Sequence, residues 1–529
     1  MFFTELWKNK IVDYNNLGDG VVGKSRTRNV SINTIIALVC QVFNLVINFI
    51  TRTVFIYVLG AEYLGINGLF TNILTILSFA ELGIGNAIVF NMYKPLATGD
   101  KEKIKTLMDL YKKAYIIIGL FVAIAGLCLT PFLKFFIKDI PDVPESILVL
   151  YILFLINTAA SYFFVYKKNI IIADQKNYIV LIMTQIIIVA RTILQILFLY
   201  LTRQFIIYLI IQIICTLVEN IACSLISNRI YPYLREKAHP LEIGERNKIF
   251  YDVKALAMYK FGSVILNGTD NILISAMIGV REVGLVSNYV LLTTSCNSIL
   301  QRITDAFTSS VGNLNATESP GKQYEIFEKI FFITSWIYGY ASVGLIVISQ
   351  SFIKLWIGED YLLETVVLLA IVVEFYVKGT HSAAYIYRVT LGFFVEGRWS
   401  NFIAAGINIV MSLLLGKWIG LEGIFIATSL SRILSVGIAD PVLIFSKGFK
   451  RNVSEYYIKY LSYFFLFIVI GWGCICVTNK IEIEGWTGVI VNVVIVTIIF
   501  NLSMFLIFMR TKMFEDLYMT FFNVIKRKK

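Results

Sequence analysis

The sequence predicts an all-α integral membrane protein with about 14 transmembrane helices. Of the 529 residues, 57% are hydrophobic and only 16% are charged, whereas a soluble domain carries about 25% charged residues. The mean hydropathy of +0.75 leaves too little polar surface for soluble domains of this length. The apolar segments are continuous rather than alternating, which favours helices over the strands of a membrane barrel.

The individual spans follow from length, because a transmembrane helix needs about 20 mostly apolar residues. A window of that length finds fourteen candidates in the chain. They lie near residues 31–58, 64–92, 114–133, 146–166, 178–200, 204–226, 255–279, 283–311, 328–350, 361–392, 399–416, 422–446, 456–478 and 486–509.

The distribution of basic residues predicts the orientation of these spans. With the N-terminus in the cytoplasm, the inner segments hold 33 Lys or Arg and the outer loops hold 7. Cytoplasmic loops of membrane proteins are enriched in these residues, so both termini are expected to be cytoplasmic. The same rule accounts for the net charge of +12, so the charge gives no reason to expect a nucleic-acid partner.

Loop length and composition exclude several other classes of protein. The longest outer loop covers about residues 134–145, which is too short for an outer catalytic domain, so an enzyme is not expected. With only two His and seven Cys, we expect no metal site and no cofactor. The segment Gly18–Ser25 fits the pattern G-x-x-x-x-G-K-[ST], but no nucleotide-binding domain fits before the first span.

An internal repeat relates the two halves of the chain. Gly60 and Gly65 match Gly279 and Gly284 at an offset of 219 residues, and Phe70 matches Tyr289 at the same offset. In both copies a span ends, a tight turn follows and the next span begins. Duplication of a six-helix unit gives two copies of the same topology. Coincidence between two short hairpins is the other interpretation.

The repeat divides the chain into five parts. We expect a cytoplasmic N-terminal segment at 1–30, an N-lobe of six spans at 31–226 and a cytoplasmic linker at 227–254. A C-lobe of six spans follows at 255–446. Residues 447–529 add two further spans and a basic cytoplasmic tail, which is suited to contact membrane lipids with anionic headgroups.

Three stretches of the sequence resemble Wzx-type polysaccharide flippases of the MATE-like MOP transporter superfamily. Residues 52–70, which run from Arg52 to Phe70, and residues 81–87 are similar to the N-terminal signature of these flippases. Residues 270–289, from Asp270 to Tyr289, are similar to the corresponding part of the second half. The resemblance implies two pseudo-symmetric six-helix lobes around a central cavity.

The resemblance also implies a function in surface polysaccharide biosynthesis. A flippase of this family moves undecaprenyl-pyrophosphate-linked oligosaccharide repeat units to the outer leaflet of the bacterial plasma (inner) membrane. Its partners are this lipid-linked oligosaccharide and the polymerase and glycosyltransferases of the same pathway. The sequence leaves open whether the glycan is O-antigen of lipopolysaccharide, capsule or another polymer.

Charged residues inside the predicted spans are the strongest indication of a transport site. Each costs about 2.5–3.5 kcal/mol at the bilayer centre on insertion scales, so a set of twelve indicates a wet cavity or mutual ion pairs. The twelve are Arg52, Glu81, Arg191, Glu219, Lys260, Asp270, Arg302, Asp305, Glu374, Lys378, Arg432 and Asp440. Six are cations and six are carboxylates, so the cavity is not expected to be cationic overall.

The tenth span carries the clearest pattern. Glu374, Lys378, His381, Tyr385 and Arg388 recur at spacings of 4, 3, 4 and 3 along one helical face, which favours a cavity wall. Glu374 and Lys378 are also placed for a local i,i+4 ion pair.

Two sets of site residues follow from these charges. Arg and Lys bind phosphate oxygens, so we expect the embedded cations to contact the anionic headgroup. These cations are Arg52, Arg191, Lys260, Arg302, Lys378 and Arg432. Desolvated carboxylates take up protons more readily, so H⁺ or Na⁺ coupling is considered at Glu81, Asp270, Asp305, Glu374 and His381. The alternative is that these groups form structural ion pairs.

Two other functions compete with the flippase hypothesis. A multidrug or small-solute exporter of the same MATE-like fold would present an aromatic cavity rather than a charged one. A membrane glycosyltransferase or polymerase would need an outer catalytic loop, which the predicted topology lacks. Alternating access of two lobes around the cavity is the expected mechanism of transport.

Overall fold

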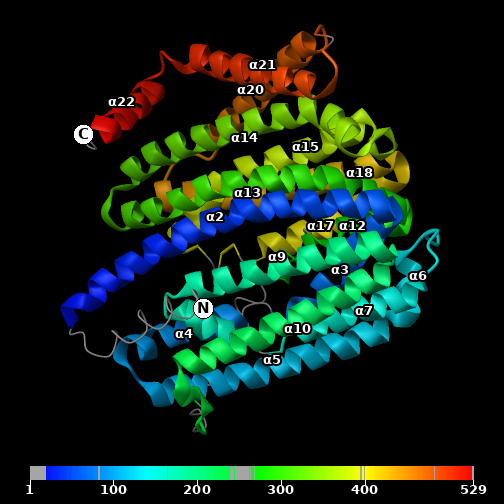
Figure 1. Ribbon diagram of the computed structural model, residues 1–529. Helices are drawn as coiled ribbons and strands as arrows, with labels where there is room; N and C mark the ends of the chain where they lie inside the picture. The colour runs from blue at the N-terminus through cyan, green and yellow to red at the C-terminus, as the bar shows by residue number, and fades with distance from the viewer. Residues whose placement is uncertain are drawn as a thin grey trace. The chain divides into compact units, whose positions relative to one another are not determined.

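Every regular element of the protein is a helix in the part of the chain that the structure describes. This computed structural model describes residues 19–81, 84–163, 165–238, 244, 261–262, 264–266, 268–393, 396–397, 399–481 and 483–526 (Figure 1). The all-α prediction is therefore confirmed for these residues. The glycine-rich match near residue 20 is helical from Asp19 onward, which is not the loop that a nucleotide-binding motif requires.

The predicted multi-pass membrane protein is confirmed, although the predicted count of fourteen spans is not. Among the described residues, eleven helices are long and apolar enough to cross a membrane, or twelve if the bent pair Ile147–Ser161 and Tyr166–Ala173 is one span. Two predicted spans are not continuous long helices. Residues 64–92 divide between two helices that flank a 3₁₀ turn. Within 255–279, the helix Asp270–Met277 has only 8 residues.

The chain divides into two compact units, and the predicted domain boundaries stay predictions. The first unit comprises Met1–Phe55, Ala80–Leu127 and Val149–Leu256, and the second comprises Ile56–Phe79, Cys128–Leu148 and Ala257–Lys529. Helices mainly in the first unit are α2 (Asp19–Leu59), α4 (Ile84–Thr98), α5 (Lys101–Leu129), α7 (Ile147–Ser161), α8 (Tyr166–Ala173), α9 (Asn177–Thr202) and α10 (Phe205–Ile230).

The second unit holds the remaining helices. They are α3 (Ala61–Leu77), α6 (Leu133–Phe136), α12 (Asp270–Met277), α13 (Val280–Thr317), α14 (Pro320–Ile357), α15 (Thr365–Thr380), α16 (Ser382–Thr390), α17 (Ser400–Ile419), α18 (Leu421–Leu434), α19 (Val436–Leu443), the π-helical turn Ile444–Phe449, α20 (Ser454–Thr478), α21 (Gly485–Phe508) and α22 (Lys512–Lys526).

A tight turn in the first unit joins α9 and α10 into a hairpin. Arg203 adopts a left-handed conformation with φ of 54° and ends α9. Phe205 opens α10 and is fully buried. Its ring centroid lies 5.6 Å from that of Phe55 on α2 and 6.2 Å from that of Phe154 on α7. This ring therefore ties three helices of the first unit together.

Aromatic rings packed edge to face and in stacks form a core cluster of the second unit. Phe327 of α14 lies 5.3 Å from Tyr387 of α16 and 5.6 Å from Phe445 of the π-helical turn, measured between ring centroids. Phe331 stacks on Tyr456 of α20 at 4.9 Å. Figure 1 shows α20 and α21 close to α14. The two C-terminal spans are thus packed onto the second unit rather than loosely appended.

One glycine from each pair of the internal repeat lies at the contact between α3 and α13 in the second unit. Gly65 of α3 packs so closely on α13 that an added Cβ would lie 1.8 Å from the carbonyl oxygen of Val280. Gly284 of α13 packs in the same way on α3, where a Cβ would lie 2.1 Å from the carbonyl oxygen of Ala61. Val280 and Ala61 are themselves equivalent at the offset of 219 residues. The two contacts exchange under the repeat, which favours duplication over coincidence.

Two transmembrane segments of the second unit carry a short interruption of the helix, although each remains one candidate span. The tenth predicted span breaks at His381, between α15 and α16, and the twelfth breaks at Ser435, between α18 and α19. Pro441 inside α19 has no N–H to give to the carbonyl of Gly437 four residues earlier. The hydroxyl of Tyr457 donates to that carbonyl instead, at 3.3 Å. The predicted irregularity at Pro441 is therefore stabilised by α20.

The α3–α13 contact gives a stability prediction. Gly65→Val should lower the free energy of unfolding by about 3 kcal/mol or more, because the backbones cannot separate without losing the packing around them. Thermal unfolding of the purified protein in detergent measures the effect. Gly406→Ala on α17 is the matched control, since a Cβ there meets nothing within 4 Å. An unchanged melting temperature for Gly65→Val would contradict the close approach.

Candidate functional site

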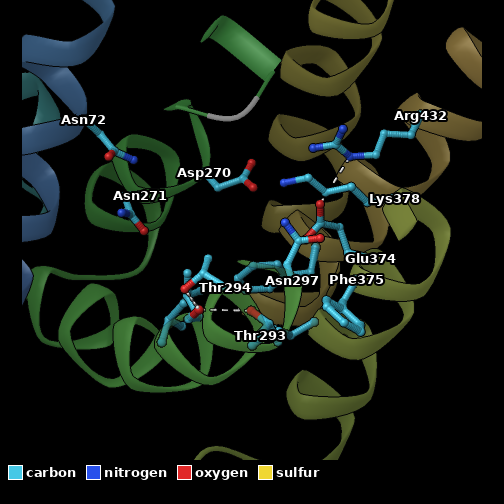
Figure 2. A pocket seen from close by; sticks show the side chains of 14 residues that line it. Asn72, Asp270, Asn271, Thr293, Thr294, Asn297, Glu374, Phe375, Lys378 and Arg432 are labelled. Carbon is cyan, nitrogen blue, oxygen red and sulfur yellow. Dashed lines mark hydrogen bonds and ion pairs between the residues drawn. The ribbon is translucent and has the colours of Figure 1, made fainter. Parts of the chain in front are cut away.

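A polar cavity of about 330 Å³ lies inside the second unit, among α3, α12, α13, α15 and α18. Figure 2 shows amide and hydroxyl side chains from α3, α12 and α13 on one side and charged side chains from α15 and α18 on the other. The polar and charged residues that line it are Asn72, Asp270, Asn271, Thr293, Thr294, Asn297, Glu374, Lys378 and Arg432. Four of the predicted site residues therefore come together in one cavity.

Glu374 forms its ion pair with another helix rather than with its own. Glu374 Oε1 lies 3.2 Å from Arg432 Nε on α18, and both side chains are largely buried. The local pair with Lys378, which the i,i+4 spacing made available, does not form. Lys378 has no ion pair or hydrogen bond among the described residues, and its side chain is exposed to the cavity. It is thus available to an incoming anion.

Asp270 is held by neutral groups. Thr428 of α18 donates to Asp270 Oδ1 at 3.1 Å, and Asn408 of α17 donates to Thr428 Oγ1 at 2.8 Å. Thr269 completes the chain by donating to Asn408 Oδ1 at 3.0 Å. In Figure 2 the side chain of Lys378 points toward Asp270 across the cavity. Among the described residues, no cation therefore contacts the Asp270 carboxyl group directly.

A second cavity of about 430 Å³ adjoins the same cations on the α20 side. Lys378 and Arg432 line both cavities. His381 lines only the second, which is otherwise walled by apolar residues and by Tyr456, Tyr457 and Tyr460 of α20. The two cations thus lie between a polar space and a largely apolar one.

The predicted stripe on the tenth span does not act as one wall. Glu374 and Lys378 face the polar cavity, but the helix breaks at His381. Arg388 beyond the break is only 3% exposed and lies 3.1 Å from Asp440 Oδ1. The residues of the predicted face thus differ in their surroundings, since Arg388 is buried in an ion pair whereas Tyr385 is 41% exposed.

Other predicted residues lie elsewhere. Arg302 and Asp305 on α13 are exposed and line neither cavity. Asp305 accepts a hydrogen bond from Gln301 at 3.1 Å. Lys260 lies outside the described residues.

The remaining three predicted residues belong to the first unit. Arg52 and Arg191 both lie within electrostatic range of Tyr208 on α10. Glu81 accepts a hydrogen bond from the Tyr115 hydroxyl at 2.8 Å. The first unit also pairs the embedded Glu219 with Lys168, so this charge is structural.

The sequence did not single out the neutral polar residues or the role of Asp440. Asn72, Asn271 and Asn297 carry no charge, so nothing marked them among the many polar residues of the spans. Asp440 was recognised as an embedded charge, and the signal that it pairs with Arg388 was absent because the two lie 52 residues apart. No cluster of three or more metal-ligating side chains occurs in the part of the chain that the structure describes.

The fold of the chain is similar to that of solved transporter structures. The chain is similar to "Lipid II flippase MurJ, inward closed conformation", with a TM-score of 0.63 and 15% identity over 90% of this chain and 98% of that chain. It is also similar to an inward-facing multidrug resistance MATE family transporter of the MOP superfamily, with a TM-score of 0.57 and 14% identity over 78% and 96%.

A third structure, of a variant of the Vibrio cholerae MATE transporter VcmN, gives a TM-score of 0.53 at 13% identity over 80% and 99% of the two chains. At such identities the likeness concerns the fold. No curated protein matches the chain. Residues 30–307 match the family described as "Polysaccharide biosynthesis protein". The chain therefore belongs to this family of polysaccharide biosynthesis proteins, and its fold is similar to that of MurJ and the MATE transporters.

Proposed function

We propose that the protein is a flippase for lipid-linked oligosaccharides. It translocates undecaprenyl-pyrophosphate-linked repeat units from the cytoplasmic to the outer leaflet of the bacterial plasma membrane, by alternating access. The family match and the transporter fold support a role in polysaccharide export. The polar cavity of the second unit supplies the site for the anionic headgroup.

Lys378 is the single observation that carries this proposal. It is an embedded cation exposed to the cavity, and it has no partner among the described residues. A cation kept in this state inside an apolar bundle is costly unless an anion or a wet cavity stabilises it. Arg432 borders the same cavity and can offer its guanidinium fork to a second phosphate oxygen. A pyrophosphate diester has the charge and the size of oxygen cluster that this pair would recognise.

The charge balance of the cavity suggests how transport is coupled to an ion. Asp270, Glu374, Lys378 and Arg432 sum to zero when all four are ionised. Uptake of H⁺ or Na⁺ at Asp270 would leave one net positive charge and favour the pyrophosphate. Because linkage is reciprocal, the pyrophosphate would favour uptake of the cation equally. Asp270 is the best candidate for this role, since its contacts are neutral groups rather than cations.

Charge reversal at Lys378 tests the anion site. Lys378→Glu should reduce translocation of the lipid-linked oligosaccharide by about 30-fold or more, because it sets a carboxylate against the phosphates. Flipping is measured in proteoliposomes, with the amount of folded protein verified by size-exclusion chromatography. The matched control is Lys417→Glu, the same change at an exposed lysine near the end of α17. Full activity of Lys378→Glu would remove this residue from the site.

Neutralisation of Asp270 tests ion coupling. Asp270→Asn should abolish the stimulation of flipping by a proton or sodium gradient, because the carboxamide cannot change charge. The assay imposes a sodium gradient at equal pH and, separately, a pH gradient without sodium. Asp305→Asn, an exposed residue outside both cavities, should keep the wild-type response. A gradient response that survives in Asp270→Asn would exclude Asp270 as the coupling site.

A further inference from the structure

Three cations from distant parts of the sequence converge at one end of the first unit. They are Lys112 of α5, Lys167 of α8 and Arg235 of the 3₁₀ turn Pro232–Arg235, which follows α10. Lys112 and Arg235 both lie within electrostatic range of the Lys167 ammonium group. Like charges repel each other, so the cluster is unfavourable unless an anion offsets the repulsion.

Neutral groups hold the Lys167 ammonium group in place. Its Nζ donates to Ser224 Oγ at 2.8 Å and to Asn228 Oδ1 at 2.9 Å, both on α10. Hydroxyl and amide oxygens accept these hydrogen bonds without adding a negative charge, so they orient the ammonium group and leave its charge in place. Lys167 is therefore a fixed positive charge beside which the other two cations lie.

The position of Arg235 is also fixed, because its neighbours in sequence are bound to α5. Lys101 Nζ lies 5.8 Å from the ring centroid of Tyr233. Lys105 Nζ lies 2.9 Å from Glu236 Oε2, and the lysine side chain is only 6% exposed. These two contacts on either side of Arg235 fold the start of the linker back onto α5, which brings the guanidinium group to the cluster.

The carboxylates near this cluster pair with other cations. Each binds a lysine outside the cluster: Asp109 binds Lys113, Glu219 binds Lys168, and Glu236 binds Lys105. Lys112 and Arg235 are both exposed, and neither has an ion pair or a hydrogen bond within the described ranges. The cluster therefore keeps a positive charge that these carboxylates do not cancel.

The cluster lies where the sequence predicts the edge of the membrane. Lys112 and Lys167 are within two residues of the ends of the predicted spans 114–133 and 146–166. The headgroups of a bilayer lie at this level, directly outside its hydrocarbon core. The cations are thus at the depth of lipid phosphates.

Exposed apolar side chains continue from the cluster along the same helices. Ile116 and Leu120 follow Lys112 at i+4 and i+8, on one face of α5, and are 38% and 53% exposed. On α10, Leu225 is 63% exposed and directly follows Ser224. A cation followed by an apolar stripe matches the order of headgroup and acyl chain in a phospholipid.

We propose that this cluster binds the phosphate diester of an anionic glycerophospholipid of the phosphatidylglycerol type. Basic pockets between transmembrane helices are suited to such headgroups. The phosphate lies among Lys112, Lys167 and Arg235 and offsets their repulsion, while an acyl chain lies along the apolar face of α5. The bound lipid thereby holds α5, α8 and the start of the linker together. The site shares no residue with the polar cavity and does not depend on the proposed function.

Lipid-dependent thermal unfolding tests the site. The full chain, delipidated in a neutral detergent, receives dioleoyl-phosphatidylglycerol or, separately, dioleoyl-phosphatidylcholine. Phosphatidylglycerol should raise the melting temperature by about 2 °C or more, and phosphatidylcholine should not. The double variant Lys112→Gln/Arg235→Gln should lose this rise. Without lipid it should melt no lower than the wild type, because the repulsion is relieved, whereas loss of a purely structural contact would lower the melting temperature.

The matched control is Lys94→Gln, the same change at an exposed lysine of α4 in the first unit, which should keep the full response to phosphatidylglycerol. An equal rise in the double variant and the wild type would overturn the proposal. So would an equal rise with phosphatidylcholine, since the site would then not select an anion.

Native mass spectrometry determines the source of the anion. The wild type should retain one phosphatidylglycerol at least about tenfold more tightly than the double variant. Neither glycerol 1-phosphate nor farnesyl-diphosphate-linked glucose should displace this lipid at equal concentration. Displacement by the first would assign the cluster to a free phosphate, and displacement by the second would assign it to a lipid-linked sugar. Either result would overturn the assignment to a membrane phospholipid.

A single variant keeps the test decisive if the double variant does not fold. Size-exclusion chromatography in detergent verifies the folded state. Lys112→Gln changes one exposed side chain and should weaken retention of phosphatidylglycerol about fivefold. Unchanged retention in this variant would contradict the proposed site.

Discussion

The requirement that ionic groups be satisfied inside an apolar bundle governs the architecture of the second unit. Asp440 is matched by Arg388 and Glu374 by Arg432, in both cases across helices that are distant in sequence. Asp270 is matched by a chain of neutral hydroxyl and amide groups. What remains is Lys378, which faces a cavity and has no partner in the described residues. The two ion pairs thus hold distant helices together. Lys378 is the cation that remains to bind an anion.

Much of the fold could be predicted from the sequence because membrane spans obey simple rules of length and hydropathy. The repeat was also visible, since Gly65 and Gly284 are required by a close helix crossing and Gly60 has a positive φ of 89° at the turn. The helix interruptions at His381 and Ser435 were harder to predict from the sequence. Only Pro441 marked a region near one of them, whereas no proline marks the interruption at His381. Both interrupted segments still count as single candidate spans, Thr365–Thr390 and Leu421–Phe449, so the hydropathy rule placed them and missed only the interruption inside each.

The site was predicted only in part, because the sequence reveals embedded charges but not their partners. Embedded charges are conspicuous in apolar segments, so Asp270, Glu374, Lys378 and Arg432 could be selected before their proximity was known. The choice of partner could not be made, because helical spacing favoured a local Glu374–Lys378 pair over the pair with Arg432. Neutral residues such as Asn72 escaped notice because amides occur throughout the spans. Charge therefore locates a transport site in the sequence, and only tertiary packing separates its functional charges from structural ones.

The most direct measurement is an experimental structure with a prenyl-diphosphate-linked sugar bound. The account predicts phosphate density in the polar cavity within hydrogen-bonding distance of Lys378 Nζ, with the Glu374–Arg432 pair intact or opened toward the same phosphates. Phosphate bound away from Lys378, with this lysine sealed in a dry ion pair with Asp270, would contradict the account.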